Sequence, residues 1–330
     1  MHTPNNNNMF IIIERDKFIE AIQKTSRFAQ QNTPLPILSC ILIVVSEEDI
    51  KFRSTNLEVG IDFKVEGSIK TTGVVAISAH ILQQIAASLT KEENITLEQS
   101  GDTVVISFNG TQNIIKTMSY EDFPIIPIAT TDKKYSFDGS VFKSAIESVL
   151  SCASTSTIRP DLASISLTFE GETLTTVATD SFRLAEKKQT FSVNIPNHTI
   201  LIPAKNSANI VQTIPNSSIT LCIDEHQITF LWEGNTLTTR LTSGIYPDYR
   251  QIIPKKTTTQ TTLLRKDFES ALRHTTIFSD AFQKIQLTFD QKKQQLILSS
   301  RNTDTGSAKE TVAAKITGDT IEQSFNYRYL

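Results

Sequence analysis

The sequence predicts an α+β fold made of three copies of one module, with two strand–helix–strands units in each full copy. Four landmarks recur along the chain at intervals of 122 to 126 residues. Each copy also contains more strand-like runs than helical ones, so its helices are too few to cover both faces of a parallel sheet. The sheets are therefore expected to be antiparallel.

The landmarks are segments of matching pattern, which is the signature of a repeated domain. The first is a helical segment around a phenylalanine, found at Phe18, Phe142 and Phe268. The second is a strand that ends in Asn or Asp, found at Asn56, Asp180 and Asn302. The third is a strand that runs into a helix, as in VVAISAHILQQI, TILIPAKNSANIV and IEQSFNYRYL. The fourth is an aromatic-Pro turn, found at Phe123 and Tyr246.

The elements of the first copy follow from its periodicities. A helix is predicted from residue 16 because an apolar stripe has helical spacing: Phe18, Ala21, Ile22, Thr25 and Phe28. Strands are predicted for the β-branched runs at 37–46, 50–55 and 59–67. A second helix at 78–89 and strands at 94–99, 103–109 and 114–119 complete the copy.

The domain boundaries are predicted from the repeat and from two polar segments, TTDKK at 130–134 and KKTTTQTT at 255–262. Residues 1–8 are expected to be a disordered extension, and residues 9–132 and 133–255 to be the first two domains. Residues 256–330 would form a third domain. That domain holds 75 residues, so it is expected to be truncated inside its second helix.

Composition and motifs exclude several classes of function. A net charge of −3 excludes a generally basic coat for nucleic acid, although a local basic surface remains possible. The sequence has no glycine-rich phosphate loop, no GxSxG and no HExxH, and its three cysteines are far apart. No metal, cofactor or membrane span is expected, and the cytoplasm is the expected location.

Asp180 has two interpretations. It could be a catalytic acid or base, but no second carboxylate lies near it in the sequence, and Asn56 and Asn302 take its place in the other copies. A side chain that caps a turn explains Asn and Asp alike, and this interpretation is favoured.

Five segments taken in order resemble the beta-subunit family of bacterial DNA polymerase III, the sliding clamps: NTPLPILSCILI, LTTVATDSFRLA, ILIPAK, GIYPDYRQIIP and SFNYRYL. The resemblance runs from about Met9 to Leu330. It implies three clamp domains per subunit and a head-to-tail ring around duplex DNA, with the helices inside and the sheets outside. It also implies a processivity factor that is not an enzyme.

The resemblance implies a set of DNA-facing residues. Long basic side chains that reach phosphates attract DNA without reading its sequence, as sliding requires. Helical faces such as that of Lys17, Glu20, Lys24 and Arg27 would serve. The residues expected to face or approach DNA are Lys24, Arg27, His80, Arg159, Lys205 and Arg273. Related clamps carry longer groups at the positions of Asn32, Ser156 and Ala204, so the grip on DNA is expected to be weaker.

The resemblance also implies a pocket for a short peptide motif carried by the polymerase III alpha subunit, the clamp loader and repair proteins. Its residues here are Leu162, Thr179, Phe182, Arg183, Leu184, Pro247 and Ile252. Leu162, Leu184 and Ile252 would form an apolar seat, and Thr179 would hydrogen-bond the peptide. Ser181 and Phe182 depart from the Gly and His that are common in the family, so the motif preference is expected to differ.

The ring contact is implied to use Ile114 and Ile115 on an edge strand of the first domain, opposite Ile277 and Phe278 of the third. With a truncated third domain the chain alone is expected to dimerise poorly, which size-exclusion chromatography with light scattering would check. Three alternatives remain open. They are a three-fold scaffold that binds protein but not DNA, an enzyme with a site around Asp180 and Arg183, and a truncated homologue that binds partner peptides without closing a ring.

Overall fold

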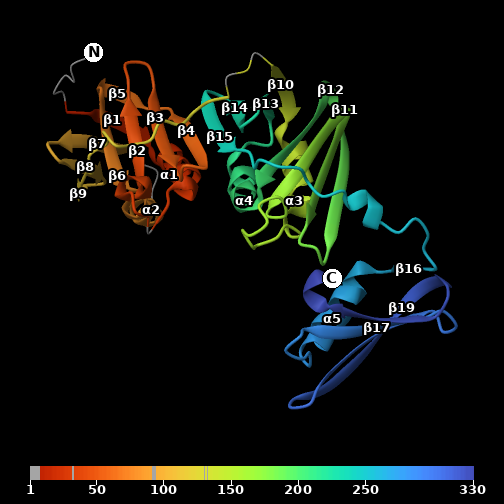
Figure 1. The fold of residues 1–330 in the computed structure, drawn as a ribbon. Helices are drawn as coiled ribbons and strands as arrows, with labels where there is room; N and C mark the ends of the chain where they lie inside the picture. Colours follow the sequence, from red (N-terminus) through yellow and green to blue (C-terminus); the bar gives the residue numbers. More distant parts are fainter. Residues whose placement is uncertain (1–7, 32, 91–93, 130, 132) are drawn as a thin grey trace. The chain divides into compact units, whose positions relative to one another are not determined.

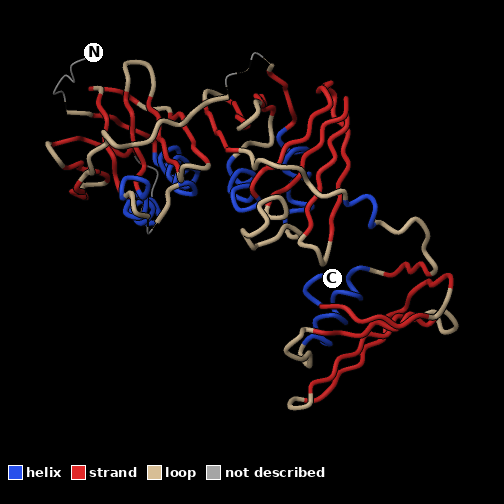
Figure 2. The backbone as a smooth tube through the Cα atoms, viewed as in Figure 1, coloured by secondary structure: helices blue, strands red, loops and turns tan. Residues whose placement is uncertain are grey.

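The computed structural model of the chain describes residues 8–31, 33–90, 94–129, 131 and 133–330. Its strands pair antiparallel throughout these residues, with helices interspersed between them (Figures 1 and 2). The predicted α+β class with antiparallel sheets is therefore confirmed. The predicted extension at residues 1–8 and the position of Asn32 lie outside the described residues, except for the last residue of the extension.

The first module begins with a strand and a helix and ends in a three-stranded meander. Its elements are β1 (Phe10–Glu14), α1 (Arg15–Thr25), η1 (Ser26–Phe28), η2 (Pro36–Ser39), β2 (Cys40–Val45), β3 (Ile50–Thr55), β4 (Val59–Val65), β5 (Ser68–Thr71), β6 (Gly73–Ser78), α2 (Ala79–Ser88), β7 (Asn94–Ser100), β8 (Thr103–Phe108) and β9 (Thr111–Lys116). Every residue of the predicted helical stripe is buried.

The second module repeats this order. Its elements are β10 (Lys134–Asp138), α3 (Gly139–Leu150), β11 (Ser164–Thr179), β12 (Leu184–Pro203), α4 (Ala204–Thr213), β13 (Ser218–Ile223), β14 (Gln227–Trp232) and β15 (Asn235–Arg240). The long strands β11 and β12 pair in two stretches, 164–169 with 198–203 and 173–179 with 184–190. These stretches match the pairs β2–β6 and β3–β4 of the first module.

Residues 248–330 form a separate compact unit. Its elements are η3 (Tyr249–Ile252), β16 (Thr259–Leu263), α5 (Arg265–Thr276), β17 (Lys284–Asp290), β18 (Gln295–Asn302), β19 (Gly306–Gly318), β20 (Ile321–Asn326) and η4 (Tyr327–Tyr329). Its five strands form one sheet in the order β16-β19-β18-β17-β20. Part of the segment 255–262, predicted as a polar connection, belongs to β16, because its alternating Thr and Gln side chains suit an edge strand that pairs with β19.

Buried hydrogen bonds support the repeat at the level of single atoms. In the first module Thr25 Oγ1 donates to the carbonyl of Ala21, and Ser54 Oγ donates to the carbonyl of Thr25. In the unit 248–330, Thr275 donates to Ala271 and Ser300 donates to Thr275 in the same way. In both modules the first bond thus lies within the first helix, and the second joins that helix to the equivalent strand of the sheet.

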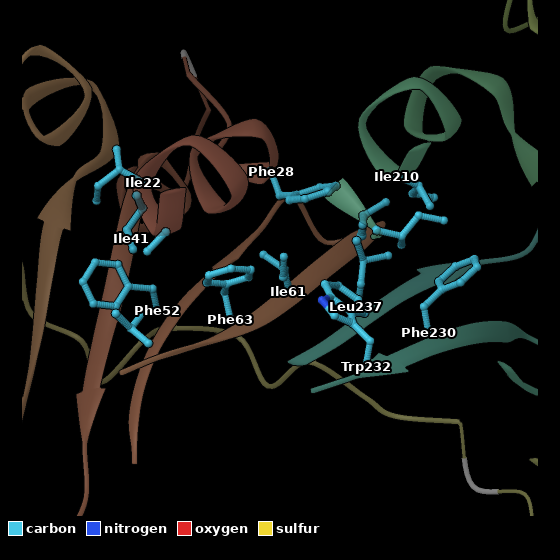
Figure 3. Close-up of a cluster of buried hydrophobic side chains, with 14 of the residues drawn as sticks. Ile22, Phe28, Ile41, Phe52, Ile61, Phe63, Ile210, Phe230, Trp232 and Leu237 are labelled. Carbon is cyan, nitrogen blue, oxygen red and sulfur yellow. The ribbon is translucent and has the colours of Figure 1, made fainter. Parts of the chain in front are cut away.

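The first two modules share one sheet and one core. Strand β15 of the second module pairs with β4 of the first, with Leu237 opposite Ile61. This pairing joins four strands of each module into one open eight-stranded sheet (Figure 1). Figure 3 shows Phe28 and Ile210, from the two modules, on the same side of this seam. Residues 1–247 therefore form one compact unit. No helix in the described part of the chain is long and apolar enough to cross a membrane.

Candidate functional site

The turn between β11 and β12 is held by the two side chains at its start. Thr179 Oγ1 donates to the carbonyl of Arg183 (2.7 Å) and accepts from the amide of Ser181 (3.2 Å). Asp180 Oδ1 accepts from the amides of Phe182 (3.0 Å) and Arg183 (2.9 Å). Ser181 adopts a φ of 75°, a left-handed conformation that favours glycine. The turn is thus fixed before any ligand arrives.

The first module contains the same turn between β3 and β4. Thr55 Oγ1 donates to the carbonyl of Val59 and accepts from the amide of Leu57. Asn56 Oδ1 accepts from the amides of Glu58 and Val59, and Leu57 has a φ of 73°. Asn302 Oδ1 likewise accepts from the amide two residues later. The turn-capping interpretation of Asp180 is therefore confirmed, because Asp180 and Asn56 each accept from two amides of their turn, and Asn302 accepts from one.

Asp180 is also the acid of a local ion pair, with Arg183 Nε at 3.1 Å from Asp180 Oδ2. Burial of Asp180 opposes its ionisation, but hydrogen bonds from the Arg183 and Phe182 amides and from the Arg183 side chain outweigh burial, and the net effect lowers its pKa. Both groups are partly buried, so the pair orients Arg183 along the turn.

Two replacements of Asp180 distinguish the effect of its turn-capping hydrogen bonds from the effect of its negative charge. Asp180→Ala should lower the free energy of unfolding by about 1 kcal/mol, because two amides lose their acceptor. Asp180→Asn should cost less, since Asn56 makes the same two bonds. The folded pKa lies below the ordinary 3.8, so the stabilisation from its ionised form is complete above pH 3.8 and is lost as the pH falls through the folded value. Thermal unfolding at pH 3 and pH 7 checks this, and an equal effect of both variants at pH 7 would contradict it.

The other predicted pocket residues differ in exposure. Leu162 and Thr179 are buried, Leu184 is half-buried opposite Thr179, and the Phe182 side chain is 80% exposed. The Thr179 hydroxyl already bonds within the turn, so it is not a free donor for a peptide as the sequence suggested. Pro247 ends the unit 1–247, whereas Ile252 belongs to the unit 248–330 and is 71% exposed there.

Lys24 lies at the junction of the first two modules. Its Nζ donates to the carbonyls of Gln212 (3.0 Å) and Thr213 (2.9 Å), where α4 ends. A lysine there satisfies carbonyls that the helix leaves unpaired. Partial burial lowers the pKa of Lys24, and the charges of Lys143 and Arg27 add to this effect. The predicted DNA contact is therefore a half-buried helix cap, which binds another module of the chain.

The remaining predicted DNA contacts are exposed. Arg27 donates to the side chain of Gln212. The Nε2 atoms of His80 and Gln84 lie 3.1 Å apart. The Arg159 guanidinium donates to both carboxylate oxygens of Asp161, at 3.1 and 2.6 Å. Lys205, in the first turn of α4, and Arg273, on α5, are exposed as well. Arg27, His80 and Lys205 come from helical segments of one compact unit, whereas Arg273 belongs to the other unit.

Lys24 and Lys205 should behave differently when each is replaced by methionine. Lys24→Met should lower the free energy of unfolding by about 1 to 2 kcal/mol, because two carbonyls at the end of α4 lose a charged donor. Lys205→Met should leave stability within about 0.5 kcal/mol of the starting value. It should instead lower the slope of log affinity for duplex DNA against log salt by about 1. Denaturation and filter binding at several salt concentrations measure both effects. A salt slope unchanged in Lys205→Met would remove it from the DNA-facing set.

Strand β9 is the outer strand of its sheet, as the sequence predicted. Ile114 on this strand is 72% exposed and lines a groove with Ile81 of α2. Ile115 points the other way and is buried in the core, so its side chain is not available to a second chain, contrary to its predicted place in the contact. In the other unit Ile277 is 69% exposed, and the Phe278 ring lies close to Gly306.

The described residues contain no cluster of three or more His, Cys, Asp or Glu that would hold a metal ion. Three family models cover nearly the whole chain. The DNA polymerase III beta subunit N-terminal domain matches residues 9–127, the central domain matches 136–248 and the C-terminal domain matches 250–330. The chain belongs to the DNA polymerase III beta-subunit family.

Individual members of this family are similar to the chain over nearly its whole length. The beta sliding clamp of Synechococcus elongatus is 24% identical over 331 residues, which cover 98% of this chain and 88% of that protein. That of Chlamydia muridarum is 26% identical and covers 96% of this chain and 87% of its own. The beta-subunit structure from Thermotoga maritima superposes with a TM-score of 0.91 at 21% identity, covering 97% of this chain and 88% of its own. The fold of three clamp domains is thereby confirmed.

The sequence predicted a capped turn at Asn56, but not how closely the turn Thr55–Gly60 repeats the hydrogen bonds of the peptide-pocket turn. The signal was present, since STNLEVG and ATDSFRL end equivalent strands of the repeat. The equivalent position of the two segments did not show that five hydrogen bonds would recur. Their recurrence depends on the left-handed backbone conformation that Leu57 and Ser181 share.

Proposed function

We propose that this chain acts as a sliding clamp, a processivity factor that encircles duplex DNA in the cytoplasm and tethers a polymerase to it. As a member of the beta-subunit family the chain is not an enzyme. The observation that carries the proposal is the match of all three family domains, in order, to a chain built from one repeated module. Copies of the chain would join through the β9 edge with Ile114, opposite Ile277 and Phe278.

Retention of DNA would come from ring closure with weak, sequence-independent attraction. The exposed side chains of Arg27, His80, Lys205 and Arg273 would meet phosphates, and Arg159 would join them when released from Asp161. Residues 156 and 204 are Ser and Ala, which adds no charge to this surface. Lys24 would support the surface indirectly, because it fixes α4 relative to α1.

The partners would be proteins that carry a short clamp-binding segment, such as the polymerase III alpha subunit and the clamp loader. The turn 179–184, with Leu162 and Pro247 of the same unit, would receive that segment. The sliding clamp of Pseudomonas aeruginosa has been solved with griselimycin bound, at 22% identity and a TM-score of 0.89 to this chain. A ligand on a related clamp agrees with a small binding pocket in this family.

Primer extension tests the proposal. With the alpha subunit and clamp loader of the same organism, adding the chain should lengthen products made in one binding event on primed circular DNA. Product lengths that do not change would argue against a processivity factor. Peptide binding without longer products would favour the alternative function, a homologue that binds partners without closing a ring.

A further inference from the structure

A groove with a volume of about 190 Å³ lies beside the turn Thr55–Gly60 of the first module. Its walls come from this turn, from the connector Pro124–Pro127 and from strands β14 and β15 of the second module. All of these residues belong to the compact unit 1–247. The shared sheet at the β4–β15 seam holds the walls in place, since Thr238 of β15 pairs with Gly60 of β4.

The groove repeats the parts of the proposed peptide pocket one module earlier. The turn Thr55–Val59 makes the same five turn hydrogen bonds as Thr179–Arg183, including the bond from the amide of the capping residue to the last carbonyl. The aromatic-Pro landmark also recurs, so Pro124 in the groove corresponds to Pro247. The counterparts of two segments that are both proposed for the pocket thus line one groove here.

The apolar surface of the groove is suited to an aliphatic side chain. Leu57 lines it from the turn and is 47% exposed, whereas the Val59 side chain beside it is buried in the core. Gly60 stands where the second module has Leu184, and a side chain there would collide with Ile126, whose Cγ2 lies 2.6 Å from an added Cβ. Ile126 therefore supplies an apolar wall in place of the missing leucine. The volume is small for a drug-sized ligand and suits one or two side chains.

The charge of the groove comes from Arg240 and Glu58. The Glu58 carboxylate accepts from Asn206 Nδ2 at 3.0 Å, so it already has a partner. The Arg240 amide donates to the Glu58 carbonyl, but across the described residues its exposed guanidinium has no ion pair or hydrogen bond. A guanidinium at the rim of an apolar groove binds a carboxylate in two-point geometry.

We propose that the groove formed by Thr55–Gly60, Pro124–Pro127 and Arg240 is a second peptide-binding site. It takes a short extended segment with an aliphatic side chain next to a carboxylate. The aliphatic side chain packs on Leu57 and Ile126, and the carboxylate pairs with Arg240. The analogy with the turn 179–184 rests on the proposed function, so the test measures peptide binding at the two sites separately.

Fluorescence anisotropy of the full chain provides the test, with two labelled probes. The first is the octapeptide Gly-Ser-Asp-Leu-Ile-Asp-Gly-Ser, and the second is the clamp-binding segment of the alpha subunit. Arg240→Glu should weaken the octapeptide tenfold or more, and Arg240→Gln about fivefold. Leu57→Asn removes the apolar wall with a residue that tolerates its φ of 73°, and should weaken the octapeptide about fivefold. Ser181→Asn is the matched control at the twin turn.

The outcomes separate this site from the proposed function. Loss of octapeptide binding in Arg240→Glu and Leu57→Asn, with Ser181→Asn unchanged, supports the groove even if the alpha-subunit segment binds nowhere. Equal binding by the chain and by Arg240→Glu overturns it, as does equal binding of a probe with both Asp replaced by Asn. A change of oligomeric state in Arg240→Glu, measured by light scattering, would also overturn it, because the groove would then be a contact between copies.

Discussion

Leu237→Ala should lower the free energy of unfolding of the unit 1–247 by about 2 to 5 kcal/mol, the usual cost of emptying a leucine site in a core. Leu237 is fully buried, and it lies opposite Ile61 where β15 meets β4. The cavity would open between two modules, so both should lose stability together. The chain's single tryptophan, Trp232, is buried beside this seam, and its fluorescence during urea unfolding reports the change directly (Figure 3).

A double-mutant cycle with Ile61→Val tests whether the two modules share their core. Residues in contact couple by about 0.5 to 3 kcal/mol, whereas distant ones add. Ile125→Ala is the control, because Ile125 is 91% exposed and should stay within about 0.5 kcal/mol of the original chain. Additive effects of Ile61→Val and Leu237→Ala would contradict packing of these two side chains against each other across the seam.

Leu184→Asp should weaken binding of the alpha-subunit segment about 30-fold or more, which corresponds to about 2 kcal/mol. Leu184 is half-buried at the end of the turn and pairs with Thr179. An aspartate there removes the apolar contact and adds a second negative charge near Asp180. Fluorescence anisotropy of the labelled segment measures the effect.

Thr190→Asp is the matched control for this substitution. Thr190 is exposed on the same strand, six residues beyond Leu184, and adds the same charge away from the turn. It should leave the affinity within about twofold. An equal loss in both variants would show that charge on β12, and not the apolar seat, governs binding.

Much of the fold follows from local patterns in the sequence. The apolar stripe from Phe18 to Phe28 predicts α1 and η1, and all of its residues are buried. The Asn or Asp at the end of the second landmark predicts the capped turn, because its side chain bonds to amides only two or three residues away. Such contacts depend on the local chain alone.

The contacts that escaped prediction depend on distant parts of the chain. Nothing local distinguishes β4 and β15 from other strands, so their pairing across two modules has no sequence signature. Lys24 has the spacing of a solvent-facing lysine, and its carbonyl partners lie 188 and 189 residues away. Ile115 is different, because strand alternation already implies that two adjacent isoleucines face opposite sides, which makes one of them a core residue.

Retention on circular DNA tests the central claim most directly. The chain is loaded by its clamp loader onto nicked circular DNA, separated by gel filtration, and half of the sample is then cut once with a restriction enzyme. The clamp should co-elute with the intact circle at moderate salt and leave the cut DNA, because a closed ring slides off an end. Equal retention on intact and cut DNA, or none on either, would contradict a ring that encircles the duplex.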